Sequence, residues 1–317
     1  MTYQPAIMSA SLGRAWLHDL SYKIHQAAEA GFKGLEIFYE DLEYEARKLS
    51  GTDNPTTTHL LAAAAHIHGM CTTRGIIIIG LQPFLFYEGL KDRTQHAHLL
   101  EKMELEIIAS DLRLLADLGA TQTPAIRFAY EPLCWSTHID TIEKAWDVVR
   151  RVDRPNFGVC LDTFNIAGRV WGDPVTPTGR TENADQELRK TLEWMVREAD
   201  VESVFYIQVV DAERMRTPLV AGHPFYVDGQ PARMSWSRNA RTFMYEDEQG
   251  GYLPCEEVAR AIIQGMGYQG FVSMELFSRT MMEEGSLVPV EHARRGIKAW
   301  ERPKERLQLR SIVKNKT

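Results

Sequence analysis

Seven short runs rich in β-branched and aromatic residues alternate along this chain with longer segments of helical hydrophobic periodicity. Strands that alternate with helices are typical of βαβ units and of a parallel sheet. The run from Ile76 to Ile79 is apolar throughout, as expected for a strand buried on both faces. We expect the strands to be Ala6–Ser9, Gly34–Phe38, Ile76–Leu81, Ile126–Tyr130, Phe157–Leu161, Val204–Val209 and Phe271–Met274. We expect the helices to include Leu20–Ala30, Thr94–Leu118, Ile139–Val152, Ala184–Ala199 and Pro254–Gly265.

Seven predicted strands favour an α/β fold of the TIM-type (β/α) barrel class, whose closed form has eight strands. The 317 residues are then expected to form a single domain, because such barrels run to about 250 residues as one unit. A doubly wound open sheet is the alternative. Against a dinucleotide-binding sheet, no Gly-x-Gly-x-x-Gly turn follows the first strand.

The charge and cysteine patterns exclude several classes of protein. The net charge is −7, with acidic and basic residues interleaved, whereas a duplex-DNA binder usually needs a basic face. The four cysteines lie far apart without a Cys-x-x-Cys pair, which favours reduced thiols in a cytoplasmic protein. No apolar run reaches the roughly 18–20 residues of a membrane span. We therefore expect no nucleic-acid or membrane partner, and the sequence leaves the oligomeric state open.

The longest stretch without regular patterning, at about 211–251, is rich in arginine, aromatic residues, proline and glycine. Long loops in a compact domain are usually lids or binding loops, and in a barrel they lie on the face that carries the active site. We therefore expect an active-site loop here. The segment from about Arg302 onward is expected to be a polar C-terminal tail.

Four predicted strands end in an oxygen-bearing side chain: Glu131, Asp162, Gln208 and Glu275. Barrel geometry brings the C-terminal strand ends to one mouth, where three carboxylates would repel one another without a cation between them. Oxygen-only ligation favours Mg²⁺ or Mn²⁺, and Co²⁺ is also compatible. A single acidic residue after a strand is often the N-cap of the next helix, and Asp162 could have that role. Four oxygen-bearing residues at the same position, the end of a strand, indicate a metal site instead.

Seven motifs spread over nearly the whole chain are Glu36–Leu42, Leu81–Phe84, Tyr130–Trp135, Asn156–Asn165, Tyr206–Ala212, Pro231–Arg238 and Met274–Phe277. In them the chain resembles the fungal, quinate-pathway type of 3-dehydroshikimate dehydratase, within the xylose-isomerase-like barrel superfamily. The resemblance implies one divalent metal on the four strand-end residues. It also implies a hydro-lyase that converts 3-dehydroshikimate, a small keto-carboxylate, to protocatechuate. Proton abstraction α to the ketone gives an enolate, loss of the β-hydroxyl follows, and loss of a further proton aromatises the ring.

Two departures from the family pattern matter. Some bacterial relatives carry a catalytic histidine near the first or second metal ligand, where this chain has Leu133 and Asn165. The sequence therefore leaves the identity of the general base undecided. Family members also have a strand and a helix for which the stretch from Leu81 to Ile126 has no room. We expect the barrel to lack this strand–helix unit, and the chain to be poorly active or unstable as a result.

Further residues are candidates for catalysis or substrate binding. His223 could act as an acid or base because imidazole titrates near neutrality, and Glu36 and Asn165 are the other catalytic candidates. Arginine suits bidentate carboxylate recognition. The candidates for substrate binding are Arg233, Arg238, Tyr87, Phe84 and Asp211.

Three other functions compete with the dehydratase. A sugar isomerase or epimerase on the same barrel would use the same ligands but needs no arginine for a carboxylate. A metal-dependent endonuclease would want a histidine-rich zinc cluster and a basic cleft, and the sequence has neither. An inactive or regulatory barrel protein is the third alternative, because a strand–helix unit is expected to be missing.

Overall fold

The computed structural model describes residues 3–83 and 105–309. Seven parallel strands form one curled sheet in the order β3-β2-β1-β9-β6-β5-β4. The strands are β1 (Tyr3–Met8), β2 (Gly34–Phe38), β3 (Ile77–Gln82), β4 (Phe128–Tyr130), β5 (Phe157–Asp162), β6 (Val204–Val209) and β9 (Gly270–Met274). All seven predicted strands are thereby confirmed, with ends that differ by a few residues.

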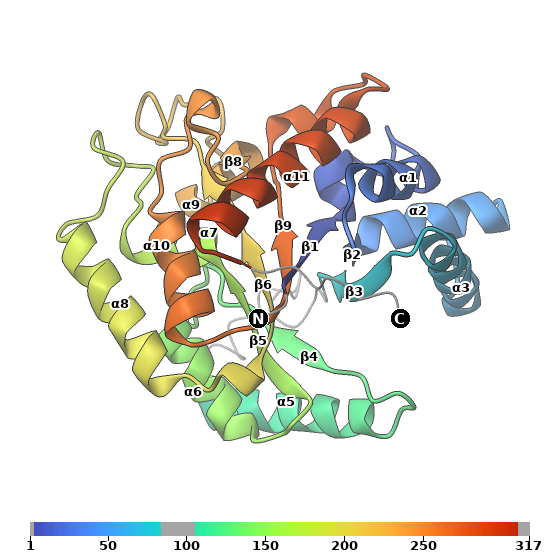
Figure 1. The fold of residues 1–317 in the computed structure, drawn as a ribbon, viewed down its shortest axis with the longest axis horizontal. Helices are drawn as coiled ribbons and strands as arrows, with labels where there is room; N and C mark the ends of the chain where they lie inside the picture. The colour runs from blue at the N-terminus through green and yellow to red at the C-terminus, as the bar shows by residue number, and fades with distance from the viewer. Residues whose placement is uncertain (1–2, 84–104, 310–317) are drawn as a thin grey trace.

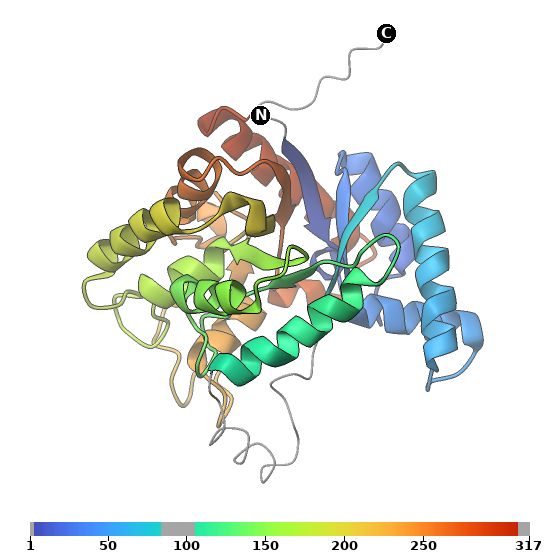
Figure 2. The ribbon, with the colours of Figure 1, turned by 90° about the horizontal axis from the view of Figure 1, so that it is seen from below.

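Helices surround the sheet on its outer side, as in a (β/α) barrel (Figures 1 and 2). Helices α1–α3 lie beside the N-terminal strands, and α5, α6 and α8 lie beside β4–β6 (Figure 1). The helices are α1 (Leu20–Ala30), α2 (Tyr39–Ser50), α3 (Thr57–Thr73), α5 (Leu105–Ala120), α6 (Ile142–Val152), α7 (Thr163–Val170), α8 (Ala184–Glu198), α9 (Ala232–Ala240), α10 (Cys255–Arg260) and α11 (Val288–Arg306). Short helical turns are η1 (Ser9–Leu12), η2 (Val201–Ser203), η3 (Asp247–Gln249), η4 (Ala261–Gly265) and η5 (Arg279–Met282).

The barrel class predicted from the alternation of strands and helices is confirmed. The direction of the strands decides at which end of the sheet the active site is expected. Because every strand of the sheet is parallel to its neighbours, the C-terminal ends meet at one mouth. Amphipathic helices such as α6, with Ile142, Trp146 and Val149 buried, cover the outer face and enclose the core. No helix in residues 3–83 and 105–309 is long and apolar enough to cross a bilayer.

Two segments expected to be irregular contain regular structure. The stretch 211–251 holds a small antiparallel pair, β7 (Asp211–Ala212) with β8 (Arg241–Thr242), and helix α9 between them. The tail expected from Arg302 begins inside α11, which continues to Arg306. Helix α9 has only a weak amphipathic pattern, whereas α11 buries residues at helical spacing, among them Ala299, Trp300 and Pro303, and so continues into the expected tail.

Strands β3 and β4 form the two edges of the described sheet. Whether a strand–helix unit is absent between them stays a prediction, because residues 84–104 lie outside the described part. Apolar side chains at these edges are open to solvent: Ile77 is 53% exposed and Leu81 55%. Unpaired strand edges with exposed apolar residues favour edge-to-edge association.

Substituting Ile77→Lys should therefore lower self-association, because a lysine on an edge strand discourages pairing with another chain. We expect the variant to stay monomeric to a concentration several-fold higher than the unchanged protein, as measured by sedimentation velocity over a dilution series. Leu287→Lys, at an exposed position just before α11, is the matched control and should leave association unchanged. Equal association of the Ile77 variant and the parent would show that these edges do not drive contact between copies.

Candidate metal centre and active site

Three carboxylates converge at the mouth of the sheet. Asp162 ends β5, Glu131 follows β4 and Glu275 follows β9. One carboxylate oxygen from each lies within 4.8 Å of the other two. Asp162 and Glu275 are buried, with 1% and 2% of their surfaces exposed. These three of the four predicted metal ligands therefore come together from three separate strands.

Asp162 combines a capping role with a place in the cluster. Its Oδ1 accepts hydrogen bonds from the backbone N of Phe164 and Asn165 at 2.6 and 3.1 Å, which makes it the N-cap of α7. Its Oδ2 faces the cluster instead. The capping interpretation and the metal-site interpretation are thus compatible, because each uses a different oxygen.

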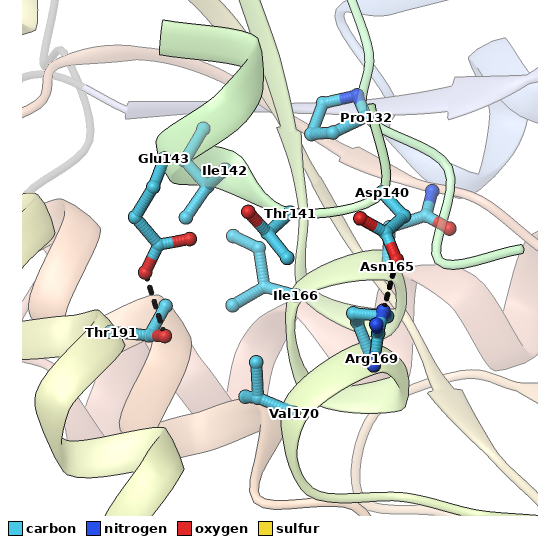
Figure 3. A pocket seen from close by; sticks show the side chains of 10 residues that line it. All are labelled: Pro132, Asp140, Thr141, Ile142, Glu143, Asn165, Ile166, Arg169, Val170 and Thr191. Atoms are coloured by element: carbon cyan, nitrogen blue, oxygen red, sulfur yellow. Dashed lines mark hydrogen bonds and ion pairs between the residues drawn. The ribbon is translucent and has the colours of Figure 1, made fainter. Parts of the chain in front are cut away.

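Asn165 orients two of the carboxylates. Its Nδ2 donates to Glu131 Oε1 at 2.7 Å and to Asp162 Oδ2 at 3.2 Å, while its Oδ1 accepts from the backbone N of Cys134 at 3.1 Å. A small cavity of about 10 Å³ lies behind it (Figure 3). That volume holds about one water molecule, so this cavity cannot admit a substrate.

Two amides connect the remaining acids. Gln208 Nε2 donates to Glu36 Oε2 at 3.0 Å and to Glu275 Oε1 at 2.9 Å. Gln82, the last residue of β3, donates through Nε2 to the same two oxygens at 2.6 and 3.1 Å. Glu36 also accepts from Ser273 Oγ. Gln82 was not among the predicted site residues, although its strand-end position is the signal that selected the other four.

Gln82→Leu should weaken metal binding, because it removes donors that fix the carboxylates of Glu36 and Glu275. Losing a group that orients metal ligands typically costs about 10- to 100-fold in affinity, and we expect a change of that order in a calorimetric Mn²⁺ titration. Gln186→Leu, on the exposed side of α8, should titrate like the parent. If both variants bind Mn²⁺ equally well, Gln82 does not position the site.

Arg241 lies in the middle of the carboxylates and was missed by the sequence analysis. The side chain is 2% exposed, and its Nη1 donates to Asp162 Oδ2 at 2.6 Å and to Glu275 Oε2. Its Nε donates to Ser237 Oγ at 2.9 Å, and the ring of Phe164 lies 4.3 Å from its Cζ. Burial opposes the charge of Arg241, but Asp162, Glu275 and Glu131 outweigh it and raise the pKa above its usual value.

The electrostatics of the site fit a cation. Burial, and then the mutual repulsion of the acids, raise the pKa of Glu131 well above its usual range. Burial likewise raises the pKa of Glu36 to about 7 and that of Glu275 to about 8. The raised pKa values mean that these acids tend to keep their protons when no metal is bound, and a divalent cation with oxygen ligands would take the place of those protons.

Gln208 fits such an ion only after a local rearrangement. As oriented, its Nε2 faces the carboxylates, and its Oε1 accepts from Cys160 Sγ at 3.3 Å. An amide binds cations through its oxygen, so ligation by Gln208 requires the side-chain amide to turn over. The donor set otherwise fits a divalent metal.

The other predicted residues lie outside this cluster. Arg233 donates to the backbone O of Gly168 and Gly172 at 2.8 and 3.0 Å, so its guanidinium holds the chain rather than facing the carboxylates. Asp211 Oδ1 accepts from three backbone N atoms, those of Ala212, Tyr252 and Leu253. These bonds give it a structural function.

His223 accepts a hydrogen bond from the backbone N of Phe225 at 3.0 Å through Nδ1, in the loop before α9. Arg238 is exposed and donates to Gln230 Oε1 at 3.2 Å. Phe84 and Tyr87 lie outside the described residues.

The family follows from a comparison with known sequences. Residues 101–302 match the model of the family described as "Xylose isomerase-like TIM barrel". The chain belongs to that family. A 3-dehydroshikimate dehydratase of Neurospora crassa is 49% identical over 93% of this chain and 92% of its own length, so the resemblance to the fungal enzymes is confirmed.

Solved structures agree with the fold. A fusion protein of a xylose isomerase-like TIM barrel and 4-hydroxyphenylpyruvate dioxygenase superposes with a TM-score of 0.64, at 23% identity, over 97% of this chain and 44% of that one. The IOLI protein, solved "with a binding zinc atom", superposes with a TM-score of 0.53 at 15% identity, over 98% of this chain and all of that one. At these identities the two structures bear on the fold alone.

Proposed function

We propose that this protein is a metal-dependent 3-dehydroshikimate dehydratase, a lyase that forms protocatechuate. The observation that carries the proposal is the convergence of Glu131, Asp162 and Glu275 at the strand ends. The chain is also 49% identical over nearly its whole length to a fungal enzyme of that name. The fungal, quinate-pathway resemblance supports aromatic catabolism as the setting.

Glu131, Asp162, Gln208 and Glu275 would hold one divalent ion, Mg²⁺ or Mn²⁺ in the first instance and Co²⁺ as a further candidate. When bound there, such an ion supplies a Lewis acid for the ketone oxygen, where negative charge develops as the α-proton leaves. Oxygen ligands alone favour Mg²⁺ and Mn²⁺ over metals that prefer sulfur.

The chain's own residues then share the remaining tasks. Arg241 fixes the carboxylates of Asp162 and Glu275 and keeps a positive charge beside the site. Asn165 has no basic atom and both ends of its amide are hydrogen-bonded, so it orients rather than accepts protons. Of the three catalytic candidates, Glu36 has its carboxylate within hydrogen-bond distance of the amides that contact Glu275. We propose Glu36 as the group that receives the α-proton, ahead of His223.

The test is the absorbance of protocatechuate formed from 3-dehydroshikimate. We expect product with Mg²⁺, Mn²⁺ or Co²⁺, its loss on adding a chelator, and its recovery when the ion is restored. If no protocatechuate forms with any of the three ions, the proposal fails. Turnover of keto-sugars in the same preparation would then favour the isomerase or epimerase alternative, and no turnover of either substrate would favour a regulatory barrel.

A further inference from the structure

A second, larger cavity lies between α11 and the loop that follows β8. Its volume is about 260 Å³, and its lining comes from the stretches 244–249 and 294–302. None of the lining residues is a member of the acid cluster at the mouth. One ordered water needs only about 10–15 Å³, so this cavity has room for a small ligand.

Hydrogen bonds between its two walls build the cavity. Arg295 of α11 donates through Nε and Nη2 to the two carboxylate oxygens of Glu246, at 2.7 and 2.8 Å. Arg302 Nη1 donates to the backbone O of Tyr245. The loop is also held from within, since the backbone N of Phe243 donates to Glu246 Oε2 at 3.0 Å. Arg295 and Glu246 therefore neutralise each other, and their contact keeps the loop in place beside α11.

Three further cations line the cavity from α11, namely Arg294, Lys298 and Arg302. They are four positions apart, so they share one side of the helix, where like charges repel one another. Arg294 and Lys298 are exposed, and neither forms an ion pair or a hydrogen bond within the part of the chain that the structure describes. The carboxylate of Glu301 pairs with Lys304 at 2.9 Å rather than with these cations.

The lining carries an excess of positive charge, in a protein whose net charge is −7. With Arg295 neutralised by Glu246, the three cations face one further carboxylate, that of the exposed Glu248. A ligand with two negative charges would balance the excess that remains. Phosphate oxygens accept hydrogen bonds from both guanidinium and ammonium groups. Met244 and Tyr245 add apolar surface for a short organic part.

We propose that this cavity binds a phosphate dianion, either free or as a small phosphate ester, and that Arg294 and Lys298 are its principal binding residues. The inference goes beyond the proposed function and does not depend on it, because the lining shares no residue with the acid cluster. A ligand bound here would not compete with a substrate at the mouth.

The test is a calorimetric titration of the full-length, metal-free protein with inorganic phosphate, glycerol 3-phosphate and glycerol. Metal-free protein is used because phosphate would otherwise bind to a metal ion at the mouth. The parent should bind at least one of the two phosphates and should not bind glycerol. Binding of the ester that is as tight as that of free phosphate, or tighter, identifies a phosphorylated metabolite as the ligand. Weaker binding of the ester identifies free phosphate.

Arg294→Gln and Lys298→Gln should each weaken phosphate binding about 10-fold, near the lower end of the range for hydrogen bonds to charged groups, because both side chains are exposed. Arg189→Gln is the matched control. It removes the same charge from an exposed position of α8 outside the cavity, and should bind phosphate like the parent. All titrations are made at one ionic strength, so that screening is equal.

Three results would overturn the inference, whatever the dehydratase assay shows. The first is a parent that binds neither phosphate. The second is a cavity variant that binds phosphate as tightly as the parent. The third is an equal loss of affinity in Arg189→Gln, since phosphate would then respond only to the net charge of the protein. Absence of protocatechuate formation affects only the proposed function, so the two failures are distinguishable.

Discussion

Replacing Glu275 by Gln is expected to reduce the affinity for Mg²⁺ or Mn²⁺ by about 100-fold or more and to abolish measurable turnover. The substitution preserves shape but removes one of the three carboxyl groups that converge at the strand ends and that could bind a cation as carboxylates. Changes to groups that only orient ligands cost about 10- to 100-fold, and loss of a charged ligand should cost at least as much. It also leaves Arg241 with one carboxylate partner fewer. The measurement is a calorimetric metal titration beside the protocatechuate assay.

Glu283→Gln provides the matched control for this prediction. Glu283 is exposed in the segment after η5, so its substitution changes the net charge equally without touching the cluster. The control should bind metal and turn over like the parent. A metal titration of the Glu275 variant that matches the parent would mean that Glu275 is not a ligand.

Arg241→Met is expected to destabilise the metal-free protein by about 3–5 kcal/mol, the usual effect of removing one partner from a buried ion pair. The carboxylates of Asp162 and Glu275 would remain buried without their cation. Added Mn²⁺ should restore much of the stability, because a divalent ion would take over the compensation and binding to the folded state is stabilising. Urea unfolding with and without Mn²⁺ measures both effects.

The control for this experiment is Arg197→Met, which alters an exposed ion pair with Glu198. Exposed pairs contribute at most about 1 kcal/mol, so the control should unfold close to the parent under both conditions. Unfolding of the Arg241 variant at the parent's urea concentration, in the absence of metal, would contradict the assignment of Arg241 as the counter-charge of this cluster.

Much of the fold could be predicted because its signals are local. A buried parallel strand needs a short apolar run, and each of the seven predicted runs overlaps a strand of the sheet. The helix Leu20–Ala30 was predicted to the residue, because its N-cap Asp19 and the glycine that follows it mark both ends. Patterning failed at α9, which depends on Arg241 and Trp236 packing against residues far away in sequence.

The candidate site, too, was predictable in part from the sequence and in part only from the structure. The sequence by itself determined that Glu131, Asp162 and Glu275 would meet, because parallel strands of one sheet must bring their C-terminal ends to one side. Only the tertiary structure decided which other groups join them. Arg241 comes from a segment without strand or helix periodicity, and Gln82 connects β3 to Glu275 across 193 positions. Arg233 instead donates to the backbone O atoms of Gly168 and Gly172. The partners of such a side chain depend on how distant segments pack together, and a local sequence pattern holds no information about that packing.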